Sequence, residues 1–323
     1  MRAIRAPDSI SLDDILAART RLAGRVPRTP LVRLEETGTS EIWLKLENLQ
    51  PVRSFKLRGA LNAMMLLSPA DLAAGVYTAS AGNMSQGLAW AARELGVRCT
   101  VVCPEGAPQT KLDGTRRLGA EVVLLPYDQW WSILETHRYE PLEPATFVHP
   151  VSDLGMMAGN GTVGLEILDD LPDVDAVLVP FGGGGLSCGI AAAVRGLKPE
   201  VQVYGCEVET AAPLTAALAA GGPVECPRTA TFVDGIGART MLAEMWPVAR
   251  RLLAGSLVVS LDEVAAAIRL LVARASVVGE GAAGAAVAAG VKGLGGTGRI
   301  VCVVSGGNID RSALATILSG GIP

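Results

Sequence analysis

The amino-acid sequence predicts an α/β protein of two domains with mostly parallel sheets. Three observations lead to this class: apolar runs alternate with helical patterns along most of the chain, the runs are apolar on both faces, and the length of 323 residues fits two domains. Strands buried on both faces are typical of parallel sheets, whose strands are joined by crossover helices.

Individual elements follow from the same patterns. The predicted strands are Leu72–Ala79, Cys99–Cys103, Glu121–Leu125, Ala176–Pro180, Val201–Glu207 and Arg299–Val304, and the predicted helices are Ser85–Leu95, Gln109–Leu118, Leu186–Arg195 and Asp262–Ala275. Near the start, Ser11 can cap a helix that runs to about Leu22. The segment Pro126–Pro150 has the weakest pattern and is interpreted either as a return crossing between domains or as a surface loop.

Composition excludes several classes of protein. Hydrophobic residues make up 50% and charged residues 19% of the chain, as in a well-packed globular protein. The net charge of −4 and the dispersed basic residues argue against a nucleic-acid partner. The one long uncharged stretch, Ala176–Val194, is broken by Pro180 and by glycines, so we expect no membrane partner. Six cysteines without CxxC spacing predict free thiols in a reducing cytoplasm.

One lysine has a context that suits covalent chemistry. Lys56 follows Phe55 and opens an apolar helical run, Leu57–Leu67. A lysine held against apolar surface has a lowered pKa, because desolvation disfavours the ammonium, and a neutral amine can form a Schiff base. An isolated lysine is more commonly a solvated surface charge.

Three turns at predicted strand ends offer places for a ligand. Ser80–Gly87 joins a strand to a helix, and its N–H groups can bind a carboxylate or a phosphate. The four glycines 182–185 permit close approach of a phosphate to the main chain, and their spacing matches neither GxGxxG nor GxxxxGK[ST]. Ser305 adds a neutral hydrogen-bonding group after a third strand. Taken singly, the first and third of these turns read as ordinary connections.

Taken together, the motifs carry a resemblance that covers about Ser11 to Asp310. Their order is SFKLRGA (54–60), SAGN (80–83), GGGGL (182–186) and SGGN (305–308). This order resembles the fold-type II pyridoxal-phosphate enzymes, specifically the serine/threonine dehydratase and serine racemase family. The resemblance implies two three-layer α/β/α domains of the tryptophan synthase β-like type: a large domain of residues 1–69 and 149–323, and a small inserted domain of residues 70–148. It also implies a pyridoxal 5'-phosphate cofactor and a homodimer.

The resemblance assigns a role to each motif residue. Lys56 would hold the cofactor covalently beside Phe55 and would serve as the catalytic base, and Asn83 would bind the phenolic oxygen of the cofactor. Ser305 would meet its pyridine nitrogen, and Glu280 would lie near its ring. The phosphate would rest on Gly182, Gly183, Gly184, Gly185 and Leu186, and the substrate carboxylate on Ser80, Ala81, Gly82, Asn83 and Met84.

Several positions depart from the family pattern. Racemases of the family have a serine where this chain has Ala81, so the alanine favours dehydration. Met84 replaces a common histidine and is either a pocket residue or core filling. Glu207 fits the first ligand of a cation site found in relatives, but Pro213 cannot supply the second, so no metal is expected. Trp130 and Trp131 are interpreted as packing residues.

The predicted function is that of a dehydratase, or ammonia-lyase. It would convert an L-threonine- or L-serine-like β-hydroxy amino acid to a 2-oxo acid and ammonia by β-elimination. The alternatives are a dehydratase for another substrate, such as 3-hydroxyaspartate or a hydroxyectoine-pathway intermediate, a cysteine synthase-like β-replacement enzyme, and a non-enzymatic binder of a phosphate ligand. Because the chain ends soon after Ser305, no regulatory domain is expected.

Overall fold

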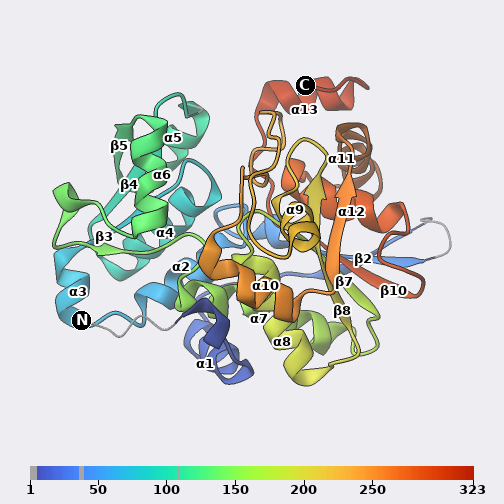
Figure 1. The fold of residues 1–323 in the computed structure, drawn as a ribbon, viewed down its shortest axis with the longest axis horizontal. Helices are drawn as coiled ribbons and strands as arrows, with labels where there is room; N and C mark the ends of the chain where they lie inside the picture. Colours follow the sequence, from blue (N-terminus) through green and yellow to red (C-terminus); the bar gives the residue numbers. More distant parts are fainter. Residues whose placement is uncertain (1–5, 36–39, 108) are drawn as a thin grey trace.

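The fold is built from two sheets that lie side by side, each with helices on both faces (Figure 1). It was obtained as a computed structural model, which describes all residues except 1–5, 36–39 and 108. The predicted α/β class with mostly parallel sheets is confirmed.

The larger sheet has six strands in the order β1-β2-β10-β7-β8-β9. The strands are β1 (Leu31–Leu34), β2 (Glu41–Lys45), β7 (Ala176–Pro180), β8 (Gln202–Val208), β9 (Gly255–Val259) and β10 (Arg299–Val303). All neighbours pair in parallel except β1 with β2. The carboxyl ends of β2, β10 and β7 therefore lie next to one another.

The smaller sheet has four strands in the order β5-β4-β3-β6, and all of them pair in parallel. They are β3 (Val76–Ala79), β4 (Cys99–Pro104), β5 (Glu121–Leu125) and β6 (Thr146–Phe147). We use the names large-sheet region and small-sheet region for each sheet with its covering helices.

Alternation along the strands fills a core on each face of the large sheet. In β7, Val177 and Val179 belong to one apolar cluster, and Ala176 and Leu178 belong to the other. The first cluster is covered by α1 (Leu12–Leu22), α7 (Leu154–Asp170), α8 (Gly185–Leu197), α9 (Pro213–Ala220) and α10 (Trp246–Leu252). The second is covered by α11 (Leu261–Ala275), α12 (Gly281–Val291) and α13 (Arg311–Leu318).

The small sheet is likewise covered on both faces. On one face lie α2 (Lys56–Met64), α4 (Asn83–Leu95) and α5 (Gln109–Arg117), and on the other lies α6 (Tyr127–Thr136). The remaining elements are α3 (Pro69–Ala74) and the short 3-10 turns η1 (Pro7–Ser9), η2 (Glu47–Leu49), η3 (Glu140–Leu142) and η4 (Ala243–Met245).

Two segments differ from the sequence-based expectation. The predicted strand Leu72–Ala79 is a strand only from Val76, because Ser68 and Asp71 form a capping box with Pro69 at the first helical position, so the chain begins α3 there. The weakly patterned segment Pro126–Pro150 contains the ten-residue helix α6, in which Ile133 and Leu134 are buried under the small sheet. The other predicted helices and strands are present, with ends that differ by a few residues.

Glycines let the helix that begins at Lys56 pack closely on two neighbours. A Cβ atom at Gly87 of α4 would lie 3.0 Å from the Cβ of Lys56. A Cβ atom at Gly159 of α7 would lie 2.5 Å from the carbonyl oxygen of Arg58. Helix α2 is thus held between one helix of each region, and its backbone position is fixed from both sides.

Two further expectations concern the cysteines and the membrane. All six cysteines are unpaired, and only Cys226 is not buried. Within the described residues, none of the helices combines the length and apolarity that crossing a bilayer requires.

Candidate active site

The topology of the large sheet gathers three of the motifs. The segment that leads to Lys56 follows β2, Ser305 follows β10, and the glycine run 182–185 follows β7. These three strands are consecutive neighbours and run in the same direction. Ligands of open α/β sheets bind at the carboxyl ends of such strands.

Lys56 is the first residue of α2, and its amine is set against apolar surface and a single carbonyl. Its Nζ donates to the carbonyl oxygen of Pro150 at 2.6 Å and lies 5.3 Å from the centre of the Phe55 ring. Burial lowers the pKa of Lys56 from 10.5 to about 8. A substantial fraction of this amine is therefore neutral and nucleophilic near physiological pH.

Lys45, which is fully buried, shows the contrast. Its Nζ pairs with the Glu166 carboxylate at 2.6 Å and donates to the Thr29 carbonyl at 2.7 Å. Among the described residues, Lys56 has no such acidic partner. The structure therefore separates a structural lysine from one whose amine is available for chemistry.

The glycine run is shaped by Val151, which follows Pro150. A Cβ atom at Gly183 would lie 2.6 Å from the Val151 side chain, and one at Gly185 would lie 2.6 Å from the Val151 carbonyl oxygen. Gly184 has φ +94°, a conformation that L side chains rarely adopt. Helix α8 begins at Gly185, so its first-turn N–H groups, including that of Leu186, have no acceptor within the helix and can bind an anion.

A polar cluster joins the two regions beside this loop. Asn83 at the start of α4 donates through Nδ2 to Glu280 Oε1 at 2.7 Å, although the two residues are 197 positions apart. Asn308 donates to Asn83 Oδ1 at 2.8 Å and, through its backbone N–H, to Glu280 Oε2 at 3.2 Å. Burial, followed by the nearby Asp234 carboxylate, raises the pKa of Glu280 to about 7. This carboxyl group can therefore hold or release a proton near neutral pH.

Ser305 lies next to the segment that leads to the lysine. It is buried, and its carbonyl accepts the backbone N–H of Phe55 at 3.1 Å. Ser54 and Gly306 also form an isolated antiparallel bridge. The strand end that carries Ser305 is thus tied by backbone hydrogen bonds to the segment that carries Lys56.

The loop from Ser80 to Gly82 follows β3 in the small sheet and is only partly buried. Ser80 is fixed through its N–H to the Val102 carbonyl at 2.9 Å, and its hydroxyl accepts the Gly82 N–H at 3.3 Å. A Cβ atom at Gly82 would meet nothing within 4 Å, so the loop borders open space. The side chain of Met84 is 1% exposed and lies in the small-sheet core, which favours the core-filling alternative.

Glu207 and Pro213, the positions compared with a cation site of relatives, lie close to the start of a helix. Glu207 accepts the backbone N–H groups of Leu214 at 2.7 Å and Thr215 at 2.8 Å, and also the hydroxyls of Thr215 and Ser256. These contacts cap α9, in which Pro213 is the first residue. Trp130 and Trp131 pack with Tyr127 on α6 and against the small-sheet core.

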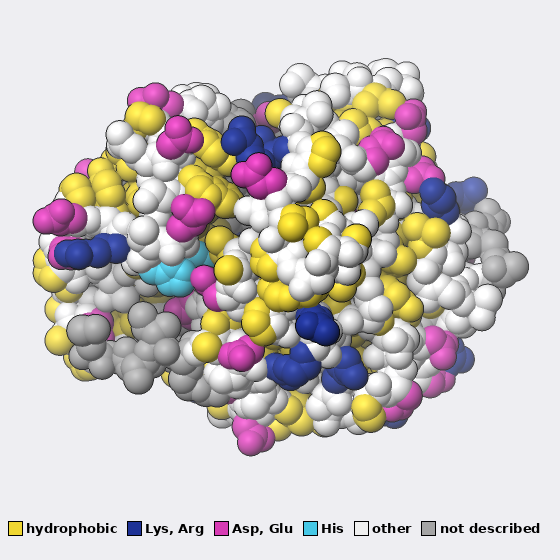
Figure 2. Space-filling view, in the orientation of Figure 1, with side chains coloured by type: hydrophobic (Ala, Val, Ile, Leu, Met, Phe, Trp, Pro, Cys, Tyr) yellow, Lys and Arg dark blue, Asp and Glu magenta, His cyan; other side chains and the backbone are white. Residues whose placement is uncertain are grey.

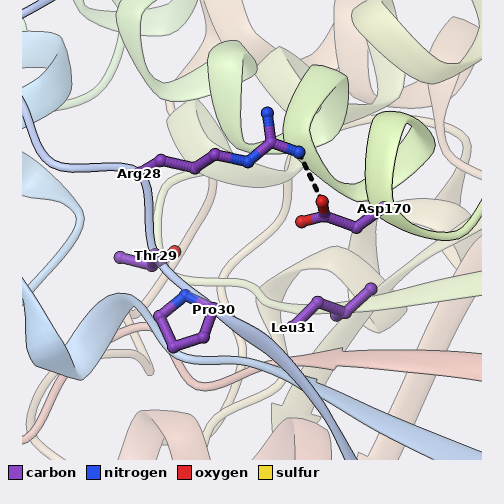
Figure 3. A pocket seen from close by; sticks show the side chains of 5 residues that line it. All are labelled: Arg28, Thr29, Pro30, Leu31 and Asp170. Atoms are coloured by element: carbon purple, nitrogen blue, oxygen red, sulfur yellow. Dashed lines mark hydrogen bonds and ion pairs between the residues drawn. The ribbon is translucent and has the colours of Figure 1, made fainter.

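A buried ionic network under α2 was not predicted from the sequence. Arg58 donates from Nε and Nη2 to Glu47 at 2.7 and 2.8 Å, and from Nη1 and Nη2 to Glu166 at 2.7 and 2.9 Å. The sequence feature that indicates this network is a charged residue, Arg58, inside the apolar run Leu57–Leu67. Beside this network is a shallow surface hollow lined by Arg28, Thr29, Pro30, Leu31 and Asp170. Arg28 and Asp170 form a solvent-exposed ion pair in this hollow (Figure 3).

The residues present fit pyridoxal phosphate. Lys56 supplies a partly neutral amine for the aldehyde, and the N-terminus of α8 supplies N–H donors for the phosphate. Asn83 Nδ2 carries a second N–H beyond the one that Glu280 accepts. The hydroxyl of Ser305 can hydrogen-bond a ring nitrogen without carrying a charge.

Comparisons with known proteins agree with this set of donors. The family model described as "Pyridoxal-phosphate dependent enzyme" matches residues 22–306. The chain is 39% identical over 319 residues to the L-threonine ammonia-lyase of Thermotoga maritima, covering 97% of this chain and 79% of the relative. It is 37% identical over 315 residues to the catabolic L-threonine dehydratase TdcB of Escherichia coli, covering 95% and 96%. The solved structure of maize serine racemase superposes with a TM-score of 0.88 at 28% identity, covering 97% and 98%.

Proposed function

The chain belongs to the family of pyridoxal-phosphate-dependent enzymes, and from this premise we propose that it removes water and then ammonia from an L-threonine- or L-serine-like β-hydroxy amino acid. The product is a 2-oxo acid. The named relatives with threonine ammonia-lyase and threonine dehydratase activity support this reaction class. When bound, the cofactor supplies an electron sink for the negative charge that develops at Cα.

The observation that carries the proposal is the state of the Lys56 amine. It lies at the carboxyl edge of the sheet, it is partly neutral near pH 8, and its hydrogen-bond partner is a carbonyl oxygen that leaves a lone pair on nitrogen free. Such an amine can bond to the cofactor aldehyde. With substrate bound, the same Nζ would take the Cα proton as general base.

The other residues bind and orient. The N–H groups of Gly182–Leu186 hold the phosphate, Asn83 holds the phenolic oxygen, and Phe55 flanks the lysine. The loop Ser80–Gly82, with the first N–H groups of α4 at Asn83 and Met84, receives the substrate carboxylate. The hydroxyl of Ser305 would hydrogen-bond the ring nitrogen, and because it carries no charge it would not favour protonation there, which would bias the reaction toward expulsion of the β-hydroxyl.

Glu280 lies where it can set the charge near the ring. Asn83 and Asn308 both donate to its carboxyl group, and its pKa of about 7 allows either protonation state. We propose that Glu280 keeps Asn83 oriented toward the cofactor and is not itself the base.

Ala81 favours elimination over racemisation. Exchange of the Cα configuration needs a proton-transfer group on each face of the substrate, and an alanine side chain cannot transfer a proton. If Lys56 and the methyl group at position 81 face opposite sides of the substrate, as the family pattern implies, a proton would be removed and returned on one side only.

The experiment is a substrate panel on the purified, cofactor-loaded protein. L-Serine, L-threonine, 3-hydroxyaspartate and bulkier β-hydroxy amino acids are supplied singly, and 2-oxo acid and ammonia are measured. We expect stoichiometric oxo acid and ammonia from at least one of them, and loss of both products in Lys56→Ala. Absence of oxo acid with every substrate contradicts the proposal; if an added thiol nucleophile is then consumed, β-replacement takes its place.

We propose three further properties. The chain is divided into a large domain of residues 1–69 and 149–323 and a small domain of residues 70–148, which the division of strands between the two sheets supports. Helix α2, which packs on the small sheet, belongs to the large domain in this division. The protein is expected to be a homodimer, which light scattering at known concentration tests. It is also expected in the cytoplasm, a location that six unpaired cysteines support.

A further inference from the structure

The chain segment that crosses from the small-sheet region back to the large-sheet region touches both parts of the cofactor site. We call residues 149–152 the return crossing. The Pro150 carbonyl accepts from Lys56 Nζ at 2.6 Å. The next residue, Val151, packs so closely on the glycine run that a Cβ atom at Gly183 or at Gly185 would lie 2.6 Å from it. The conformation of the return crossing therefore sets the position of the amine and the shape of the phosphate loop.

One side chain holds this conformation. The imidazole Nδ1 of His149 lies 3.0 Å from the backbone N–H of Val151, 2.8 Å from that of Ser152 and 3.0 Å from the Ser152 hydroxyl. Because both backbone groups are donors, this ring nitrogen accepts and carries no proton. The backbone of the return crossing therefore turns around the imidazole, with two of its N–H groups directed at Nδ1.

The second ring nitrogen reaches the other region. His149 Nε2 lies 3.1 Å from the carbonyl oxygen of Leu134 in α6, and a carbonyl can only accept. Nε2 therefore carries the proton, and the hydrogen-bond network assigns the neutral Nε2–H tautomer. His149 ties α6 of the small-sheet region to the backbone beside Lys56.

The surroundings keep this ring neutral. His149 is 3% exposed, and burial lowers its pKa to about 3. The charged groups nearest to it are His137, Glu244 and Lys56. His137, whose ring centre is 4.5 Å away, pairs with Glu244 at 2.9 Å and is partly exposed at the junction of the two regions, where Figure 2 shows histidine surface in cyan.

The three side chains His137, His149 and Glu244 lie close enough together to hold a metal ion. Binding one through His149 would require breaking its bonds either to Val151 and Ser152 or to Leu134, because both ring nitrogens are used. The geometry favours a structural use of His149 over metal binding.

We propose that neutral His149 is a positioning residue for the reaction. By bonding Leu134 on one side and the N–H groups of Val151 and Ser152 on the other, it aims the Pro150 carbonyl at Lys56 and seats Val151 on the glycine run. The inference rests on the proposed role of Lys56 as the cofactor lysine.

Two variants separate the two halves of this role. His149→Phe keeps an aromatic ring and removes both sets of hydrogen bonds. His149→Asn keeps an oxygen that can accept N–H groups two and three residues later, as in an Asx turn, but is too short to reach Leu134. His137→Phe is the matched control, since the chain has two histidines and this one reaches the return crossing less directly. It makes a tilted ring contact with His149 and pairs with Glu244, which in turn hydrogen-bonds Ser152.

The readout is kcat per bound cofactor, so that losses from poor folding cancel. We expect kcat to fall about 10- to 100-fold in His149→Phe, as for a small misplacement of a reacting group. His149→Asn should recover most of that loss, and His137→Phe should show little change. An unchanged kcat in His149→Phe, or an equal fall in His137→Phe, overturns the proposal.

Nuclear magnetic resonance of protein labelled with ¹⁵N in histidine tests the tautomer without any variant. We expect one imidazole to keep the neutral Nε2–H pattern from about pH 5 to pH 8, across the range in which an ordinary histidine titrates. If both rings titrate, or if the constant ring is the Nδ1–H tautomer, the assignment is wrong.

Failure of this inference can be distinguished from failure of the proposed function. Retention of cofactor colour and activity in Lys56→Ala would contradict the function itself. Normal kcat in His149→Phe, with colour lost in Lys56→Ala, would contradict only the role of His149.

Discussion

The carboxyl edges of the two sheets are built differently. At the large-sheet edge, the segment that carries Lys56 is tied to Ser305 through the backbone hydrogen bond of Phe55, and the glycine run is packed closely against Val151. At the small-sheet edge, the loop Ser80–Gly82 is partly buried and borders open space. Under the proposed function, the edge that would hold the cofactor is fixed in advance, whereas the edge that would receive the substrate leaves room for a ligand.

Gly183 and Gly82 illustrate this difference between the two sheet edges. Gly183 is needed because Val151 occupies the place of its missing side chain, whereas Gly82 has no atom within 4 Å of that place. The first glycine shapes a packed loop. The second leaves volume in front of a loop that is anchored at Ser80, and substrate selection is expected there.

The largest expected effect tests the rigidity of the large-sheet edge. Arg58→Met removes one member of a buried ionic network and leaves Glu47 and Glu166 short of a partner, so we expect the free energy of unfolding to fall by about 3–5 kcal/mol. Urea unfolding of the two proteins measures the difference.

The control for that variant is Arg28→Met. Arg28 pairs with Asp170 at the surface, with half of its side chain exposed, so its removal should change stability by only about 0–1 kcal/mol. Equal losses of unfolding free energy in the two variants would show that the buried network under α2 stabilises the protein no more than an exposed ion pair does.

The second effect concerns the phosphate loop. In Gly183→Ala the new Cβ meets the stiff Val151 side chain, and overpacking of this kind costs about 1–3 kcal/mol. We expect the dissociation constant for pyridoxal phosphate to rise by about tenfold for each 1.4 kcal/mol, as measured by equilibrium dialysis. Unchanged affinity would mean that Val151 moves aside freely.

The third effect is a pH dependence of covalent capture. Because burial lowers the pKa of Lys56 to about 8, the rate at which apoprotein captures pyridoxal phosphate should rise with pH and reach half its maximum near pH 8. The sign for stability follows: the penalty for a buried ammonium is complete below pH 8, and the apoprotein gains stability as pH rises from 8 toward 10.5. Stopped-flow absorbance gives the profile, and a midpoint near 10.5 would contradict the burial of this amine.

The smallest expected effect is that of Gly82→Ala. The added methyl group enters open space and meets no protein atom, so cofactor affinity and stability should stay near their wild-type values. The KM for the amino acid should change by a few-fold, with most of kcat retained. A loss of cofactor comparable to that of Gly183→Ala would erase the distinction between the two edges.

The sequence indicated the motifs well because they lie at strand ends, where glycine and small polar residues stand out against apolar runs. It did not indicate the partners of those motifs. Asn83 and Glu280 meet across 197 positions, and no local pattern reports such a contact. His149 lies in the segment Pro126–Pro150, whose pattern indicates only a return crossing or a surface loop, because the role of this residue depends on a carbonyl in α6.

Two local sequence patterns predicted the wrong secondary structure. The apolar residues Leu72 to Ala74 suggested a strand, although Ser68, Pro69 and Asp71 form a helix start. Prolines later in Pro126–Pro150 obscured the helix from Tyr127 to Thr136. Helix α3 has no buried residues and is set by its capping box, whereas α6 is held by the burial of Ile133 and Leu134 against the small sheet.

The most direct test of the account is chemical. Active, cofactor-loaded protein is treated with borohydride, digested and analysed by mass spectrometry. The account predicts that the reduced cofactor is found on the peptide that contains Lys56, and that the fully buried Lys45 is unmodified because Glu166 and Thr29 hold its amine. Cofactor mass on another lysine, or active protein with Lys56 unmodified, would contradict it.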